Sequence, residues 1–285
     1  MLNWSIRLFR ILGIQLSVHS TFFVLLAYVA WEGWYNPPIE HLAYPIYGAL
    51  ISVAILVVIF ACVVLHELGH ALTARRFGVG VPRILLLPIG GMAEFDSIPR
   101  KPSNELLIAL AGPAVNFAIV AVLLCFVSLP GEQIASFVQS VFSTNSVETE
   151  TSMSLLQQIL VGLLVMNLMM GCFNLVPVFP MDGGRVLRAL LATRLNYLKA
   201  TFYAVTVAKV LAGLAVVVAI SYEKWQIATL FAFIFVVGEM EYRAVKRRER
   251  EDERWRQRLA ALEVAPIQLP VTWSSSTIGQ GNPES

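Results

Sequence analysis

Apolar residues in this chain gather in long runs that shorter polar segments separate. A helix needs about 20 apolar residues to cross a bilayer, so runs of this kind predict membrane helices. Six are predicted, at about Ile11–Trp31, Tyr47–Phe77, Glu105–Leu129, Leu155–Val176, Phe202–Ile220 and Trp225–Met240. We therefore expect an all-α polytopic membrane protein with about six transmembrane helices.

The remaining segments are more polar and differ from one another. A short amphipathic basic segment, Met1–Arg10, precedes the first run, and helical spacing of apolar residues within Pro130–Met153 predicts an interfacial helix. Residues 241–264 are charged and rich in helix formers, which predicts a cytoplasmic helix. That helix is either simply solvated or a contact for a partner or anionic lipid. The tail, 265–285, is predicted to be disordered.

Composition and charge narrow the class of protein. With 57% hydrophobic and 14% charged residues, the chain is not an ordinary soluble enzyme, and a net charge of +2 implies no nucleic-acid partner. The three cysteines form no C-x-x-C pair, so no disulfide framework is expected. The basic start lacks a small-residue cleavage site, so we expect a retained helix. The lack of a transit-like leader favours a bacterial cytoplasmic membrane over an organellar one.

Basic residues lie almost entirely on one side of the predicted topology. The loops Glu32–Pro45 and Pro130–Met153, on one side of the predicted membrane, contain no Lys or Arg. All of the 21 basic residues except Lys209 and Lys224 lie in the segments on the other side. Because basic loops stay in the cytoplasm, both termini are expected there. Helices two and four then both run toward the cytoplasm.

The second helix carries an H-E-x-x-H pattern at His66, Glu67 and His70. Two histidines at i and i+4 lie on one helix face and can bind one Zn²⁺, while the glutamate can take a proton from a metal-bound water. Ionisable side chains are expensive inside a membrane helix and usually mark function there. Cys62, one turn earlier, is either a fourth resting-state ligand or a small buried apolar residue.

A tetrahedral site with one open position needs a third protein ligand, and Asp182 is the best candidate. It lies in Asn174–Arg185, where two prolines break the helix ahead of it and Gly183-Gly184 permits a tight turn behind it. The other histidines, His19 and His41, have no partner at ligand spacing. The predicted orientation brings this aspartate and the histidine pair to the same half of the membrane.

The connector Val81–Phe95 is apolar but too short to span a membrane, and Pro88 and Gly90-Gly91 interrupt it. It predicts a re-entrant membrane hairpin between helices two and three. The unpaired edge of such a hairpin could receive an unwound substrate segment by strand addition. The alternative is a merely apolar loop.

Together these motifs resemble the site-2 protease family of intramembrane zinc metalloproteases, also called peptidase family M50. The resemblance rests on His66–His70, on Asn174–Gly183 with its two prolines, on Gly90-Gly91 and on Ala111–Asn116, and it covers about Ile11–Leu195. It implies a transmembrane metalloprotease domain at 1–240 with its core at 11–195, followed by the charged helix and the tail. Family members often carry a PDZ or CBS domain, and neither is recognisable here.

The resemblance implies that His66, His70 and Asp182 bind one Zn²⁺ per chain and that Glu67 is the catalytic base. It further implies that Asn174 donates to the scissile carbonyl or the oxyanion, whereas the alternative is a helix–helix hydrogen bond.

Four other polar residues in the predicted helices have less specific assignments. Asn116 and Asn167 are expected to make structural polar contacts. His19 either faces the site or is a packed polar residue, and Lys209 has no evident partner.

The function implied is an intramembrane zinc endopeptidase that cuts transmembrane segments of single-pass substrates near the cytoplasmic side of the lipid bilayer. Anti-sigma factors, membrane-tethered regulators and remnant signal peptides are the family's usual substrates. One rival is a zinc transporter or metal sensor, which the one-sided placement of acids and histidines disfavours. Another is a proteolytically inactive scaffold, which the presence of Glu67 disfavours.

Overall fold

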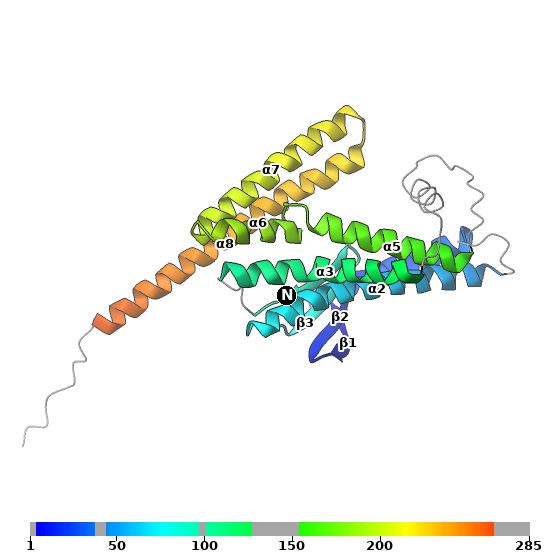
Figure 1. Cartoon of the computed structure of the whole chain (residues 1–285), viewed down its shortest axis with the longest axis horizontal. Coiled ribbons are helices and arrows are strands. Elements are labelled where there is room, and N and C mark those ends of the chain that lie inside the picture. The colour runs from blue at the N-terminus through cyan, green and yellow to red at the C-terminus, as the bar shows by residue number, and fades with distance from the viewer. Residues whose placement is uncertain (1–3, 38–43, 97–100, 127–153, 265–285) are drawn as a thin grey trace, which may run out of the picture. The chain divides into compact units, whose positions relative to one another are not determined.

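The computed structural model describes residues 4–37, 44–96, 101–126 and 154–264. These residues form α-helices and a four-stranded sheet (Figure 1). In chain order the elements are β1 (Ser5–Ile11), β2 (Ile14–His19), α1 (Thr21–Tyr35), α2 (Pro45–Arg76), β3 (Arg83–Leu87), β4 (Gly90–Glu94), α3 (Pro102–Phe126), α5 (Leu155–Asn174), α6 (Asp182–Ala192), α7 (Tyr197–Ser221) and α8 (Trp225–Val264). The predicted interfacial helix within Pro130–Met153 and the predicted disordered tail lie outside the described residues.

Residues Ser5–His19 form a β-hairpin, so the prediction of a helix that begins at Ile11 was wrong: Ile11 ends β1, and α1 begins at Thr21. In β2 the apolar residues Ile14, Leu16 and Val18 alternate with polar ones and are 1%, 5% and 4% exposed. That period of two is typical of a strand with one buried face. The alternation was not recognised as a strand because the apolar residues continue directly into α1.

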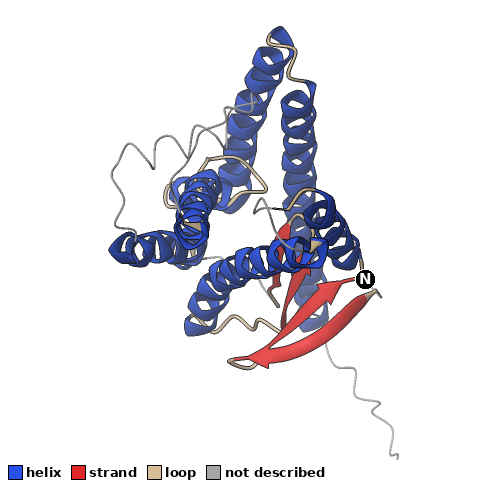
Figure 2. Ribbon diagram, turned by 90° about the vertical axis from the view of Figure 1, so that its right-hand side faces the viewer, coloured by secondary structure: helices blue, strands red, loops and turns tan. Residues whose placement is uncertain are grey.

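The sheet has the strand order β1-β2-β3-β4 and lies beside the helices (Figure 2). β1 pairs with β2 and β3 pairs with β4 in antiparallel fashion, whereas β2 and β3 are parallel. A parallel pair requires a crossover connection, which α1 and α2 provide here. The predicted all-α class is therefore corrected to a mainly helical fold with a small mixed sheet. The predicted connector hairpin is present as β3–β4, and its insertion into the membrane stays a prediction.

Four helices in the described residues are long and apolar enough to cross a membrane: Pro45–Arg76, Pro102–Phe126, Leu156–Asn174 and Tyr197–Ser221. The predicted count of about six is not confirmed. Helix α1 has only 15 residues, or about 22 Å, which is short for a bilayer. The apolar beginning of α8 soon reaches the charged residues Glu239 and Glu241.

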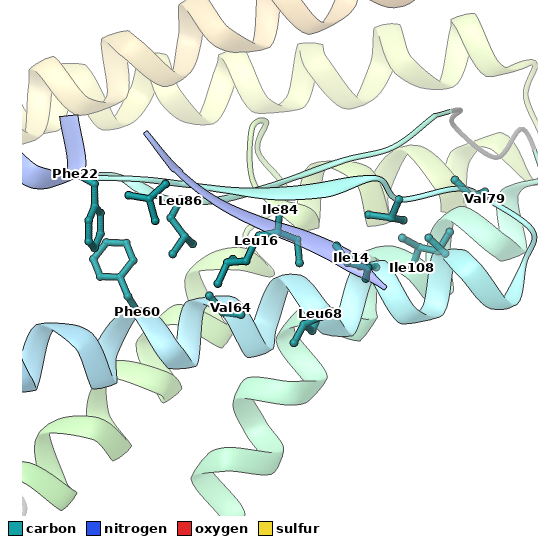
Figure 3. Packing of buried hydrophobic residues seen from close by; sticks show 14 residues of the cluster. Ile14, Leu16, Phe22, Phe60, Val64, Leu68, Val79, Ile84, Leu86 and Ile108 are labelled. Atoms are coloured by element: carbon teal, nitrogen blue, oxygen red, sulfur yellow. The ribbon is translucent and has the colours of Figure 1, made fainter. Parts of the chain in front are cut away.

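The main core joins the sheet to α2 (Figure 3). Ile14 and Leu16 of β2 and Ile84 of β3 belong to the same buried cluster as Val64 and Leu68 of α2. Because residues two apart on a helix point in nearly opposite directions, His66 and His70 face away from the sheet and toward α3. Packing of the sheet therefore fixes the rotation of α2 about its own axis.

The chain divides into two compact units, 1–242 and 243–285. The residues that carry the candidate chemistry all belong to the first unit.

Candidate metal centre

Two histidines of α2 meet one carboxylate of α6 in the interior of the first unit. The Nε2 atoms of His66 and His70 lie 3.1 Å apart, and the side chains are 5% and 4% exposed. Oδ2 of Asp182 lies 3.3 Å from Nε2 of His66 and 3.0 Å from Nε2 of His70. The structure thus brings together three residues of which the first and the last are 116 positions apart in the sequence.

The donor set fits a zinc ion. In a tetrahedral site with bonds of about 2.0–2.1 Å, the donor atoms lie about 3.3–3.4 Å apart, close to the separations found here. Oδ2 of Asp182 is buried and has no hydrogen-bond partner among the described residues. A buried carboxylate oxygen without a partner is unfavourable unless a cation or donor reaches it. Two imidazoles and a carboxylate also leave the fourth position that a catalytic zinc requires.

The outer nitrogens of both histidines are held by hydrogen-bond acceptors. Nδ1 of His66 lies 2.5 Å from Oδ1 of Asn116, and Nδ1 of His70 lies 2.7 Å from the backbone oxygen of Ile108. Both acceptors belong to α3. Since an amide or carbonyl oxygen only accepts, each Nδ1 carries the hydrogen and each Nε2 presents its lone pair to the centre.

Helix α3 approaches the two histidines unusually closely. A Cβ atom on Gly112 would lie 2.1 Å from Nε2 of His70 and 2.8 Å from Cε1 of His66. Only glycine can occupy this position while α2 and α3 keep their present spacing. The Ala111–Asn116 stretch is part of the resemblance, but no sequence pattern indicates why Gly112 must be a glycine or that Asn116 contacts His66.

Glu67 lies beside the two histidines on α2 and points toward the β3–β4 hairpin. Its Oε2 accepts a hydrogen bond of 3.1 Å from the backbone N–H of Ala93 in β4. Gly91 is packed directly against the same side chain, because a Cβ atom there would lie 2.6 Å from Cγ of Glu67. Carboxylate and edge strand are therefore in contact.

An ion pair closes the open end of this hairpin. Nη2 of Arg83 in β3 lies 2.6 Å from Oε1 of Glu94 in β4. The hydrogen bond from the Arg83 guanidinium holds the pKa of the Glu94 carboxyl below its ordinary value.

An irregular segment between α5 and α6 positions Asp182. Val178 and Phe179 in this segment are 3% and 2% exposed and pack in clusters with residues of α7. Asp182 begins α6, so Gly183-Gly184 lies in the first helical turn and not in the tight turn that was predicted. A buried ion pair holds the helix further along, where Nε of Arg188 donates to Oε1 of Glu105 on α3 at 2.8 Å.

The other candidates have different surroundings. Asn174 is the last residue of α5, and its side chain makes no hydrogen bond to the described residues. His19 ends β2, where Nδ1 lies 2.8 Å from Oγ1 of Thr21. Cys62 is buried but is not among the three grouped donors. Lys209 pairs with Glu239 of α8, a partner that the sequence had not identified.

Comparisons with known proteins give consistent matches. A family model described as peptidase family M50 matches residues 54–220, which include the whole donor set. Zinc metalloprotease MJ0392 of Methanocaldococcus jannaschii is 36% identical over 245 residues, 86% of this chain and 62% of that protein. Putative zinc metalloprotease Rip3 of Mycobacterium tuberculosis is 32% identical over 192 residues, 67% of this chain and 44% of that protein. The chain thus spans less than two thirds of the length of these curated relatives.

A solved structure matches as well. The site-2 protease from Methanocaldococcus jannaschii has a TM-score of 0.53 and 36% sequence identity, and the match covers 84% of this chain and 95% of that one.

Proposed function

Because this chain belongs to peptidase family M50, we propose that it is an intramembrane zinc endopeptidase that cleaves transmembrane segments of single-pass substrates near the cytoplasmic side. The observation that carries the proposal is the buried group of His66, His70 and Asp182 with Glu67 beside it. Anti-sigma factors, membrane-tethered regulators and remnant signal peptides are the substrate classes that the family suggests.

In this proposal His66, His70 and Asp182 hold one Zn²⁺. A bound zinc ion supplies Lewis acidity, which polarises a peptide carbonyl and makes water acidic near neutral pH. Glu67 takes the proton from the attacking water and passes it to the leaving amine. The Nδ1 hydrogens of both histidines are held by acceptors on α3, so both Nε2 atoms would stay directed at the metal during the reaction.

The position of the ligands along α2 supports cleavage near one membrane surface. His66 lies ten residues and His70 six residues before Arg76, the last residue of the helix. At 1.5 Å per residue these distances are about 15 Å and about 9 Å. With the basic end of α2 and both termini on the cytoplasmic side, the metal lies within the cytoplasmic half of a bilayer of about 30 Å.

We propose that the outer edge of β4 binds the substrate as an added strand. The N–H of Ala93 points to Glu67 and not to β3, so the backbone groups of Ala93 and, two residues away, Gly91 face outward. An extended peptide paired there would pass directly by Glu67. A helical segment must unwind first, because its backbone groups are already paired with one another.

Asn174 is the proposed donor to the oxyanion. It ends α5, eight residues before Asp182, and the described residues leave its amide without a hydrogen bond. An amide donor aimed at the developing charge typically contributes about 10²–10³ in rate.

The test is cleavage of a panel of tagged single-pass proteins by purified protein in detergent, with zinc content measured on every sample. Wild type should cleave and contain zinc, Glu67→Gln should keep zinc without cleaving, and Asp182→Ala should lose zinc. Unchanged cleavage by Glu67→Gln would refute the assignment of the base. Zinc flux across vesicles that depends on Asp182, with no cleavage of any panel member, would favour the transporter.

A further inference from the structure

A chain of buried amides extends from His66 across α3 into α5. Oδ1 of Asn116 accepts from Nδ1 of His66, Nδ2 of Asn116 donates to Oδ1 of Asn167 at 3.0 Å, and Nδ2 of Asn167 donates to the backbone oxygen of Leu163 at 2.8 Å. Both asparagines are fully buried, with 0% exposure. Neither asparagine is therefore open to water, so neither amide can reverse cheaply.

The direction of this chain follows from its last member. The oxygen of Leu163 can only accept, so Asn167 must turn its NH₂ group toward it and its Oδ1 toward Asn116. Asn116 must then present its own NH₂ to Asn167 and its Oδ1 to His66. Reversal of either amide would place two donors or two acceptors against each other in a buried site, which typically costs about 1–3 kcal/mol for each unsatisfied group.

We propose that Asn167 is a positioning residue for the metal: through Asn116 it keeps the hydrogen of His66 on Nδ1 and thereby leaves Nε2 free to bind zinc. Asn167 itself lies on α5 and is not a ligand. The inference rests on the proposed function only in taking the His66, His70 and Asp182 group as a zinc site.

His70 provides an internal contrast. Its Nδ1 lies 2.7 Å from the backbone oxygen of Ile108, so its tautomer is fixed directly by the backbone of α3. His66 has a side-chain amide in the equivalent place, and an amide can turn over. A second residue is therefore needed for His66 and not for His70.

The competing explanation is a plain structural contact between α3 and α5, because asparagines often join membrane helices in this way. The two explanations differ in what they predict for zinc. A structural contact affects the stability of the helix pair, whereas the positioning role affects the affinity of the metal site.

The experiment measures zinc affinity by competition with a chromophoric chelator, on full-length protein in detergent. Asn167→Leu removes both hydrogen bonds and keeps the branched shape of the side chain, and the dissociation constant for zinc should rise about tenfold or more. Asn167→Asp keeps both hydrogen bonds when the new carboxyl group is protonated: one oxygen accepts from Asn116, and the O–H donates to the backbone oxygen of Leu163. The zinc affinity of Asn167→Asp should therefore stay close to that of wild type. Thr201→Val is the control: Thr201 on α7 is fully buried, and among the described residues its hydroxyl donates only to the backbone oxygen of Tyr197, so zinc affinity should not change.

Equal zinc affinities of Asn167→Leu and Asn167→Asp, whether both normal or both weak, would overturn the proposal. Should Asn167→Leu fail to fold, Asn167→Ala replaces it, because it removes the same two hydrogen bonds with a smaller side chain. A carboxylate at 116 offers an oxygen to His66 whichever way it turns, so adding the folded substitution at 167 to Asn116→Asp should cost no affinity, and a further loss would overturn the proposal. Absence of zinc from wild type would instead refute the metal site itself.

Discussion

The carboxylate of Glu67 accepts a hydrogen bond of 3.1 Å from the backbone N–H of Ala93, which joins the proposed base on α2 to the edge strand β4. A base that acts on water beside a peptide bond must lie next to the path of that peptide. The hydrogen bond therefore fixes the position of Glu67 relative to β4, the proposed binding edge for the substrate. Because the N–H of Ala93 is already bonded to Glu67, a bound peptide would have to pair with other outward backbone groups of β4, such as those of Gly91.

Gly91→Ala should lower kcat/KM while zinc content stays normal. The new Cβ would lie 2.6 Å from Cγ of Glu67, so the base has to move, and a shift of about 1 Å can cost about 100-fold in rate. The measurement is cleavage kinetics together with bound zinc. Gly213→Ala on α7 is the matched control, because a Cβ there would meet nothing within 4 Å. Normal kinetics of Gly91→Ala would contradict the close packing of β4 on Glu67.

Gly112→Ala should act on the metal and not on the base. Its Cβ would lie 2.1 Å from Nε2 of His70, which requires a ligand to leave its place, so zinc affinity should fall by more than about tenfold. Zinc titration of the purified variant measures this. Zinc binding equal to that of wild type would mean that α3 does not approach the histidines as described.

Arg188→Met should destabilise the protein strongly. Glu105 is 0% exposed and would be left as an unpaired buried charge, a change that typically costs about 3–5 kcal/mol. The double variant Arg188→Met, Glu105→Gln should recover most of the loss. Unfolding in detergent is the readout, and Arg83→Met, which breaks the partly exposed pair with Glu94, should cost about 1 kcal/mol or less. Equal losses for the two arginine variants would contradict the burial of the Arg188 pair.

Zinc should stabilise wild type against unfolding, and Cys62→Ala should respond in the same way. At a free zinc concentration 100 times the dissociation constant, binding to the folded state alone adds about 2.7 kcal/mol. Asp182→Ala should show a much smaller response at the same concentration, because it lacks one donor. A reduced response of Cys62→Ala would make the cysteine a fourth ligand, contrary to the grouping of donors in the structure.

The grouping of His66, His70 and Asp182 was predictable because metal-binding residues follow chemical rules that sequence spacing expresses directly. His66 and His70 are one helical turn apart. The distribution of basic residues predicted an orientation in which Asp182 lies in the same half of the membrane. The resemblance to the site-2 protease family is confirmed by the family match and by the solved relative. The four long apolar helices were likewise evident from hydropathy.

Features that depend on packing between distant segments were not predictable in this way. Nothing in the spacing of Asn116 indicates that its oxygen would meet His66, because that contact depends on how closely α2 and α3 approach. The pairing of Lys209 with Glu239 depends on the register of α7 against α8. The strand β2 was missed for a different reason, since its alternation is short and continues into an apolar helix.

The parallel pairing of β2 with β3 has a consequence for any attempt to trim this protein. Residues 54–220 hold every proposed ligand and the base, yet a fragment of that length would lack β1 and β2. β3 would then become an edge strand. Ile84 and Leu86 would lose their neighbours in β2, and a row of unpaired backbone groups would be open to self-association. We therefore expect the smallest working unit to begin with the first hairpin, although none of the three grouped donors belongs to it.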